Sequence, residues 1–187
     1  MRRVSSCLRA DGQGCTESKR KYTILHLSEK DKDMDPNCHS NFMAQANDIA
    51  RRSTCVRRPV GAIIVRRGTV ISRGWNGILQ GYKDCREAEC PRCIKGGDTG
   101  IGYETCICIH AEQHAIADAA RRGVSTRESA LYVNLRPCLQ CLAIAEAARI
   151  REIFYGEGWK YSDQVEKIYR ILSERFDSFS RVAELRG

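Results

Sequence analysis

Beginning at residue 40, apolar positions recur with periods that distinguish helices from strands. Residues 40–52 carry apolar side chains at helical spacing and start with a Ser and an Asn, either of which can cap a helix. Residues 59–65 form a nearly continuous apolar run, and a turn at residues 67–68 leads into a second strand at residues 69–75. The pattern predicts a helix followed by a β-hairpin.

Helices and strands alternate in the remainder of the chain. The predicted elements are a helix at 110–121, a strand at 130–134, a helix at 137–149, a strand at 152–155, a helix at 163–174 and a last strand at 179–183. A hairpin followed by alternating helices and strands predicts an α/β domain with three α-β-α layers around a mixed sheet of about five strands.

Two segments lack such periodicity. Residues 1–38 are polar and of mixed charge, which predicts a poorly ordered N-terminal extension ahead of a domain at residues 39–187. Residues 76–109 are rich in Gly and Cys and are predicted to form a long loop.

Composition narrows the class of protein. No apolar run approaches the roughly 20 residues of a membrane span, and the first residues lack the apolar stretch of a secretory signal. We therefore expect a soluble, cytoplasmic protein without a membrane partner. The eleven cysteines, odd in number and partly in C-x-x-C spacing, favour metal binding in a reducing compartment over disulfides.

The chain carries a net charge of +8, which attracts anionic partners. Several arginines occur in pairs, but no aromatic residues are interleaved with them. A stacking platform for single-stranded nucleic acid is not evident, which argues against a nucleic-acid partner and leaves an anionic small molecule.

The strongest chemical signal combines H-A-E at residues 110–112 with P-C-L-Q-C at residues 137–141. His110, Cys138 and Cys141 offer three zinc ligands and leave a fourth position open, which is the arrangement of catalytic zinc. The combination matches the H-x-E and P-C-x-x-C signature of zinc-dependent nucleobase deaminases. A structural zinc is the alternative, and it would need a fourth protein ligand.

Each residue of the signature has a chemical role. A Pro at the first helical position pre-sets the helix, whose positive end favours thiolates at Cys138 and Cys141. Glu112 is the predicted proton shuttle, because a carboxylate two residues from a ligand histidine can reach both water and substrate.

Four segments resemble the deoxycytidylate deaminase family. Residues 53–65 are similar to the opening of that family, and G-W-N-G at 74–77 resembles its G-Y-N-G. H-A-E-Q-H-A-I at 110–116 resembles H-A-E-Q-N-A-I, and L-Y-V-N-L-R-P-C-L-Q-C at 131–141 resembles L-Y-V-T-L-x-P-C-x-x-C. The resemblance covers roughly residues 40–160 and keeps the motif order.

The resemblance implies the cytidine deaminase-like fold, zinc, and hydrolytic conversion of dCMP to dUMP with release of ammonia. It further implies that Asn76 contacts the substrate and that Arg121 binds the 5′-phosphate. His114 stands where the family has asparagine, and we expect it either to reach the substrate or to pack behind it. A nucleoside triphosphate effector and a homo-oligomer, such as a hexamer, are also implied.

Further cysteines surround these motifs and suggest a second, structural zinc. They are Cys55, Cys85, Cys90, Cys93, Cys106 and Cys108. A C-x-x-C pair in a Gly-rich loop is typical of a zinc knuckle. By position, the resemblance implies Cys55, Cys85 and Cys108 as ligands, with Cys90 or Cys93 as the fourth. The alternative is a cluster of free buried thiols.

Three other functions compete with dCMP deamination. One is deamination of another cytosine species, such as CMP, dCTP or a modified cytosine nucleotide. The second is deamination of a flipped base in RNA or DNA, which the charge permits but the missing stacking platform disfavours. The third is a catalytically inactive zinc-binding module, against which the intact Glu112 argues.

Overall fold

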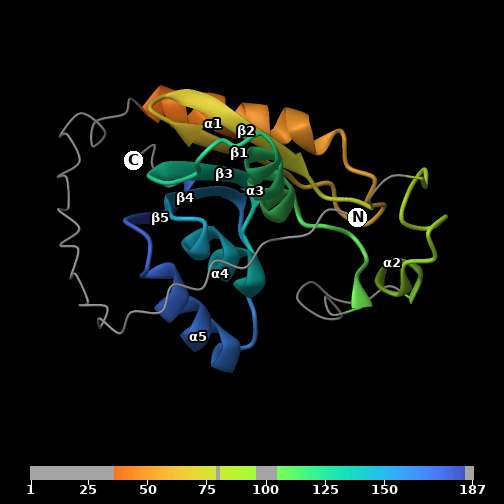
Figure 1. Ribbon diagram of the computed structural model, residues 1–187. Coiled ribbons are helices and arrows are strands. Elements are labelled where there is room, and N and C mark those ends of the chain that lie inside the picture. The colour runs from red at the N-terminus through yellow and green to blue at the C-terminus, as the bar shows by residue number, and fades with distance from the viewer. Residues whose placement is uncertain (1–35, 79–80, 96–104, 184–187) are drawn as a thin grey trace, which may run out of the picture. The chain divides into compact units, whose positions relative to one another are not determined.

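A computed structural model describes residues 36–78, 81–95 and 105–183 (Figure 1). The predicted N-terminal extension lies almost entirely outside these residues, so its order stays a prediction. Among the described residues, no helix is both long and apolar enough to cross a membrane.

One mixed five-stranded sheet organises the described chain. Its strands are β1 (Gly61–Arg66), β2 (Thr69–Trp75), β3 (Ser129–Leu135), β4 (Ile150–Glu157) and β5 (Ser178–Arg181), in the order β2-β1-β3-β4-β5. β1 pairs antiparallel with β2 and with β3, whereas β3–β4 and β4–β5 are parallel. The predicted hairpin and mixed sheet are confirmed.

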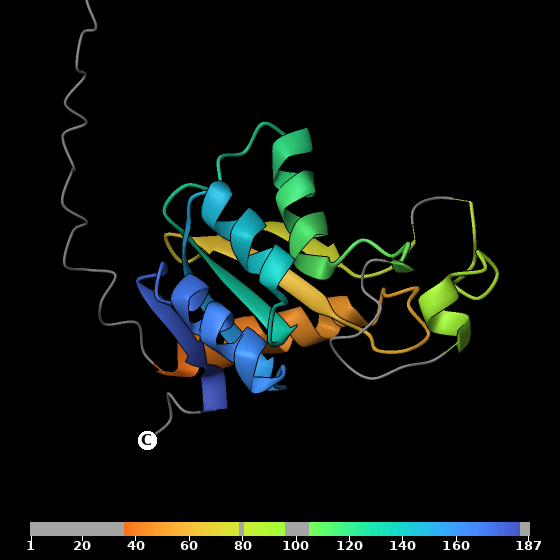
Figure 2. The same ribbon diagram turned by 90° about the horizontal axis from the view of Figure 1, so that it is seen from below.

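Helices cover both faces of the sheet. They are α1 (Pro36–Ala50), α2 (Pro91–Lys95), α3 (Ala111–Arg121), α4 (Leu139–Ala147) and α5 (Asp163–Ser173). α1 lies on one face and α3, α4 and α5 on the other, which confirms the three layers (Figures 1 and 2). α1 begins before the predicted residue 40, and the single-turn α2 interrupts the predicted loop because a five-residue helix leaves no periodic pattern.

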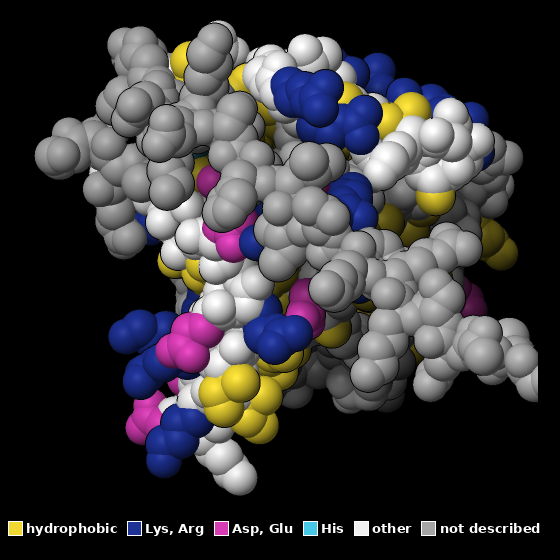
Figure 3. Space-filling model, turned by 60° about the vertical axis from the view of Figure 1, so that its left-hand side comes forward, with side chains coloured by type: hydrophobic (Ala, Val, Ile, Leu, Met, Phe, Trp, Pro, Cys, Tyr) yellow, Lys and Arg dark blue, Asp and Glu magenta, His cyan; other side chains and the backbone are white. Residues whose placement is uncertain are grey.

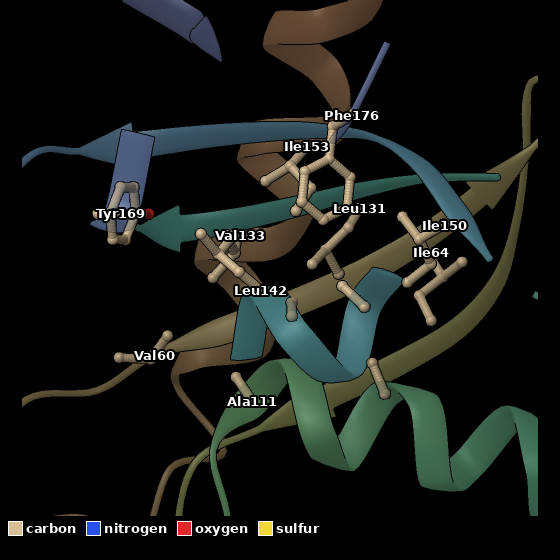
Figure 4. Close-up of a cluster of buried hydrophobic side chains, with 13 residues drawn as sticks. Val60, Ile64, Ala111, Leu131, Val133, Leu142, Ile150, Ile153, Tyr169 and Phe176 are labelled. Atoms are coloured by element: carbon tan, nitrogen blue, oxygen red, sulfur yellow. The ribbon is translucent and has the colours of Figure 1, made fainter. Parts of the chain in front are cut away.

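Two apolar clusters hold the layers together, because the central strands are buried on both faces. Ile63 and Tyr132 point to the α1 side, where Met43 and Phe154 join them. Leu131, Val133 and Leu142 lie between the sheet and helices α3 and α4 (Figure 4). This burial explains why β1 and β3 appear in the sequence as continuous apolar runs.

Charged side chains of both signs share the surface. On the described part of one face, Lys and Arg side chains lie beside Asp and Glu side chains along the lower edge (Figure 3). Ion pairs between described residues include Arg151–Asp177, at 2.7 Å, and Arg175–Glu146, at 2.7 Å.

Close packing of α3 on β2 depends on Gly74. A Cβ atom at this position would collide with the backbone of Ala111 and Ala115, so the helix lies directly against the strand. The first turn of α3 carries the candidate catalytic residues, and Gly74 therefore positions them.

We expect Gly74→Ala to lower the free energy of unfolding by about 1–3 kcal/mol, because α3 must move away from β2 to admit the methyl group. Urea denaturation measures the change. Gly158→Ala is the control, since no atom lies within 4 Å of the added Cβ there. Equal stabilities for the two variants would show that α3 does not need this contact.

Candidate active site

The three predicted metal ligands lie at the N-termini of two helices. His110 is the N-cap of α3, Cys138 is the N-cap of α4, and Cys141 lies in the first turn of α4. The predicted start of α4 at Pro137 is wrong by two residues. Cys138 has extended backbone angles (φ −81°, ψ 168°), so Pro137 precedes the cap and the helix begins at Leu139.

These ligand atoms lie at distances that suit a zinc ion. His110 Nδ1 lies 3.3 Å from Cys141 Sγ and 3.4 Å from Cys138 Sγ. Tetrahedral zinc, about 2.0–2.1 Å from nitrogen and about 2.3 Å from sulfur, separates such ligands by roughly 3.6 Å. Among the described His, Cys, Asp and Glu side chains, no fourth ligand joins this group. The donor set therefore fits zinc with one position left for a small molecule.

The surroundings favour thiolate at this centre. The N-termini of α3 and α4 lie side by side in Figure 2, and both helix dipoles present their positive ends there. A hydrogen bond with Cys141 lowers the pKa of Cys138 to about 4, with His110 adding to the effect. Cys138 is thus available as a thiolate at neutral pH.

Glu112 is a buried carboxyl group beside the ligands. It lies in the first turn of α3 and is only 4% exposed. Burial raises the pKa of Glu112 to about 7, and the charge of Cys138 contributes in the same direction. A carboxyl group with this pKa can both accept and donate a proton near neutral pH.

A cavity of about 230 Å³ opens next to these residues. His110, Glu112 and Cys138 contribute to its lining. The other lining residues are Cys55, Arg57, Arg58, Val60, Asn76, Arg92, Cys106, Cys108, Ala111, Leu135, Arg136 and Trp159. A pocket with a metal-ligand triad, a carboxyl group, several guanidinium groups and an indole suits a small anionic molecule with an aromatic ring.

Asn76 reaches this cavity through a tertiary contact. Gly77 and Ile109 exchange two backbone hydrogen bonds, of 3.1 and 2.9 Å, which bring the end of β2 beside the segment that leads into α3. The Asn76 carboxamide accepts from Ser53 Oγ at 2.6 Å and from the Val60 backbone at 2.7 Å. These bonds hold its side chain rigidly at the cavity wall.

The structure does not bring His114 or Arg121 to the cavity. His114 packs edge-on against Trp75, with 4.5 Å between ring centroids, and its Nδ1 lies 3.0 Å from the Trp75 carbonyl oxygen. Arg121, whose side chain is 75% exposed, lies in the last turn of α3 and pairs with Asp118 at 2.9 Å. Their predicted contacts with substrate stay predictions.

Arg136 is a cavity residue that the sequence reading did not single out. Its guanidinium pairs with both carboxylate oxygens of Glu166, at 2.8 and 2.9 Å, and lies 3.7 Å from the ring centroid of Tyr169. Its carbonyl accepts a hydrogen bond from Trp159 Nε1 at 2.6 Å. The only feature of the sequence that points to Arg136 as a cavity residue is that it directly precedes Pro137 of the zinc motif.

Two tyrosines anchor the same loop. Tyr169, 1% exposed, donates its hydroxyl to the Pro137 carbonyl at 2.9 Å, and Tyr161 accepts from the Leu139 backbone at 3.2 Å. The start of α4, and with it Cys138, is therefore held by α5 and by the segment that precedes α5.

Three of the six additional cysteines, Cys55, Cys106 and Cys108, line the cavity. Cys55, Cys85, Cys93 and Cys108 have all four sulfur atoms within 4.8 Å of one another. The geometry thus brings Cys93, rather than Cys90, to the other three. Cys90 belongs to a second group, which also contains Cys106 and Cys108.

We expect Tyr169→Phe to lower the free energy of unfolding by about 1–2 kcal/mol, because the buried Pro137 carbonyl loses its partner. Urea denaturation of the zinc-loaded protein checks this. Tyr82→Phe is the control, since that side chain is 56% exposed. A Tyr169→Phe variant as stable as this control would show that the hydroxyl does not anchor the loop.

Comparisons with known proteins agree with this site. The family model described as "Cytidine and deoxycytidylate deaminase zinc-binding region" matches residues 36–157. The deoxycytidylate deaminase of Schizosaccharomyces pombe is 37% identical over 139 residues, covering 70% of this chain and 43% of that protein. The Saccharomyces cerevisiae deoxycytidylate deaminase is 33% identical over 164 residues, covering 86% of this chain and 52% of that protein.

A solved structure shares the fold. The dCMP deaminase of cyanophage S-TIM5, in complex with dCMP and dUMP, has a TM-score of 0.59 and 22% identity, and the match covers 80% of this chain and 99% of that chain. The present chain spans about half the length of the two yeast relatives. The family match includes the histidine, the glutamate and both cysteines of the metal centre, and the chain belongs to the zinc-binding cytidine and deoxycytidylate deaminase family.

Proposed function

We propose that this protein hydrolytically deaminates a cytosine nucleotide, converting dCMP to dUMP and ammonia. The observation that carries the proposal is the triad of His110, Cys138 and Cys141 beside buried Glu112, in a cavity with several arginines. The relatives named deoxycytidylate deaminases, and the related phage structure with dCMP and dUMP, support this substrate over other cytosine nucleotides.

The residues of the site divide the chemistry between them. Zinc held by His110, Cys138 and Cys141 would supply the Lewis acidity that makes water acidic enough to react near neutral pH. Glu112 takes one proton from water as the water oxygen bonds to C4 of cytosine, and it passes that proton to the ring nitrogen N3. It then moves the second proton of the same water to the amino group, and the C4–N bond breaks so that ammonia leaves and a carbonyl group forms at C4. Burial of Glu112 keeps its pKa in the range that both transfers need.

We propose that arginines lining the cavity bind the phosphate. Arg57, Arg58 and Arg92 line the cavity together with the metal ligands. Arg57 donates to the Arg92 carbonyl at 3.1 Å, and Arg58 pairs with Glu157, so their positions are coupled to neighbouring segments. Guanidinium groups bind phosphate through charge-assisted and bidentate hydrogen bonds. Arg136 differs from Arg58 because it bonds both carboxylate oxygens of Glu166 and its side chain is only 12% exposed, so it positions the loop instead.

We further propose that Cys55, Cys85, Cys93 and Cys108 hold a structural zinc. Cys85 Sγ accepts a hydrogen bond from the Val56 backbone at 3.3 Å, a contact that stabilises thiolate. Cys55 and Cys108 also line the cavity, and Cys108 lies two residues before His110. A metal at these sulfurs would tie the long segment between β2 and α3 to the catalytic residues.

Incubation of the zinc-loaded protein with a panel of substrates tests the function. The panel contains cytosine, deoxycytidine, CMP, dCMP, dCTP and short DNA and RNA oligonucleotides, and ammonia release is measured. We expect dCMP to be the preferred substrate. We also expect Glu112→Gln to keep its zinc yet lose at least about 100-fold in kcat, because proton transfer fails.

The control variant is Glu174→Gln, an exposed carboxylate at the end of α5, which should leave kcat unchanged. Preference for CMP or dCTP would change the assigned substrate, and activity on oligonucleotides alone would overturn it. Normal turnover by Glu112→Gln would remove this residue from proton transfer.

A second prediction concerns phosphate recognition. We expect Arg92→Gln to raise KM for dCMP by about tenfold or more while leaving deoxycytidine turnover unchanged, because only dCMP carries the phosphate. Steady-state kinetics with both substrates measure the split. Arg86→Gln, an exposed arginine in the preceding turn, is the matched control.

Arg121→Gln in the same assay decides between the two phosphate assignments. If Arg121→Gln selectively raises KM for dCMP and Arg92→Gln does not, the phosphate belongs to Arg121. Equal losses on dCMP and deoxycytidine in the Arg92→Gln variant would give Arg92 a structural role.

A further inference from the structure

Beyond the four proposed zinc ligands, two more cysteines belong to the same sulfur cluster. The cluster consists of Cys55, Cys85, Cys90, Cys93, Cys106 and Cys108. Cys55, Cys85, Cys93 and Cys108 form one group of potential ligands, and Cys90, Cys106 and Cys108 form a second. Cys108 belongs to both groups, so the two candidate sites share a sulfur atom.

Cys93 is a second cysteine that can connect the two groups. Cys108 lies within 4.8 Å of Cys55 in the first group and of Cys106 in the second. Cys93 lies within 4.8 Å of Cys85, and Cys90 is among the side chains that act on its thiol. The sulfur atom of Cys93 is not within 4.8 Å of all three sulfur atoms of the second group, so binding of a second ion would draw it toward them.

We propose that the six cysteines bind two zinc ions as a binuclear thiolate cluster, which extends the single structural zinc proposed above. Cys55 and Cys85 are the terminal ligands of the first ion, and Cys90 and Cys106 are those of the second. Cys93 and Cys108 bridge the two ions. Two four-coordinate ions present eight ligand positions, and six thiolates fill all of them when two of the thiolates bridge.

Backbone donors around the cluster support thiolates rather than thiols. Cys55 accepts hydrogen bonds from the backbone N–H groups of Arg57 and Arg58, and Cys106 accepts one from the backbone of Cys108. Such N–H···S contacts are the second layer of support that metal-bound sulfur uses. They reach terminal ligands of both proposed ions, so both halves of the cluster have this support.

Charge and burial also support a cluster of two zinc ions. Two zinc ions and six thiolates leave a net negative charge, and the Arg92 guanidinium lies close enough to Cys106 to attract its thiolate. Cys85 and Cys90 are completely buried, and the described cysteines are all free rather than paired in disulfides. Such a dense group of buried thiols on short, weakly structured segments gains its order from metal.

The zinc content of the full-length chain tests the proposal. Protein produced with added zinc and kept reduced is measured by native mass spectrometry and by elemental analysis. We expect about three zinc ions per chain, one catalytic and two in the cluster. The double variant Cys90→Ser/Cys106→Ser should retain about two, because the first cluster ion keeps its four ligands. Cys38→Ser, an exposed thiol outside the cluster, is the control and should retain all three.

The other possible zinc counts distinguish the binuclear cluster from the single structural zinc proposed above. Two zinc ions in both the wild-type chain and the double variant would overturn the binuclear cluster and leave the single structural zinc in place. One zinc in the wild-type chain would overturn both. A third zinc that survives the double substitution lies elsewhere and likewise overturns the proposal.

A spectroscopic measurement covers the case in which the double variant does not fold. Cadmium-113 NMR of the wild-type chain loaded with cadmium should show two resonances in the range of four-sulfur coordination, besides that of the catalytic centre. One such resonance would contradict the binuclear cluster.

Discussion

The site depends on the contact between the N-termini of α3 and α4 at one edge of the sheet. His110 and Cys141 are separated by 31 positions in the chain, yet their ligand atoms lie 3.3 Å apart. The parallel pairing of β3 and β4 and the close packing of α3 on β2 bring the two helix ends together. Because the positive ends of both helices meet there, the place is suited to thiolate ligands and to an anionic reaction partner.

Other parts of the chain hold this arrangement from two sides. On one side, α5 anchors the segment before α4 through Arg136, Glu166 and Tyr169, so that Cys138 caps its helix in a defined position. On the other side, Cys55, Cys106 and Cys108 of the cysteine cluster line the cavity, and only Ile109 separates Cys108 from His110.

Burial of Glu112 destabilises its charged form, but it also gives the carboxyl group a pKa that suits proton transfer near neutral pH. A carboxyl group with 4% exposure favours its protonated form, which raises its pKa to about 7. The same desolvation strengthens its interactions with the neighbouring ligands. The exposed carboxylates on the surface, which pair with arginines such as Arg151 and Arg175, have no comparable role because water screens them.

The layers, the hairpin and the three ligands could be predicted from the amino-acid sequence, since these follow from local periodicity and from motif spacing. The sequence pattern placed the start of α4 two residues too early, because Pro137 is favourable both at a first helical position and just before a cap. The family resemblance also suggested a phosphate role for Arg121, which lies about 16 Å along α3 from His110. In the structure that distance carries Arg121 to the exposed end of the helix, where Asp118 pairs with it.

The set of residues that share the cavity could be identified only from the folded chain. Arg57 and Trp159 lie in loops and Arg92 lies in the short helix α2, and nothing in the sequence marks any of the three as a cavity residue. Likewise, the choice of Cys93 over Cys90 as partner of Cys55 required the folded arrangement of the loops. The physical reason is that a motif records neighbours along one helix or strand. Contacts between loops depend instead on how packing of the whole sheet and its helices closes the chain around the metal ligands.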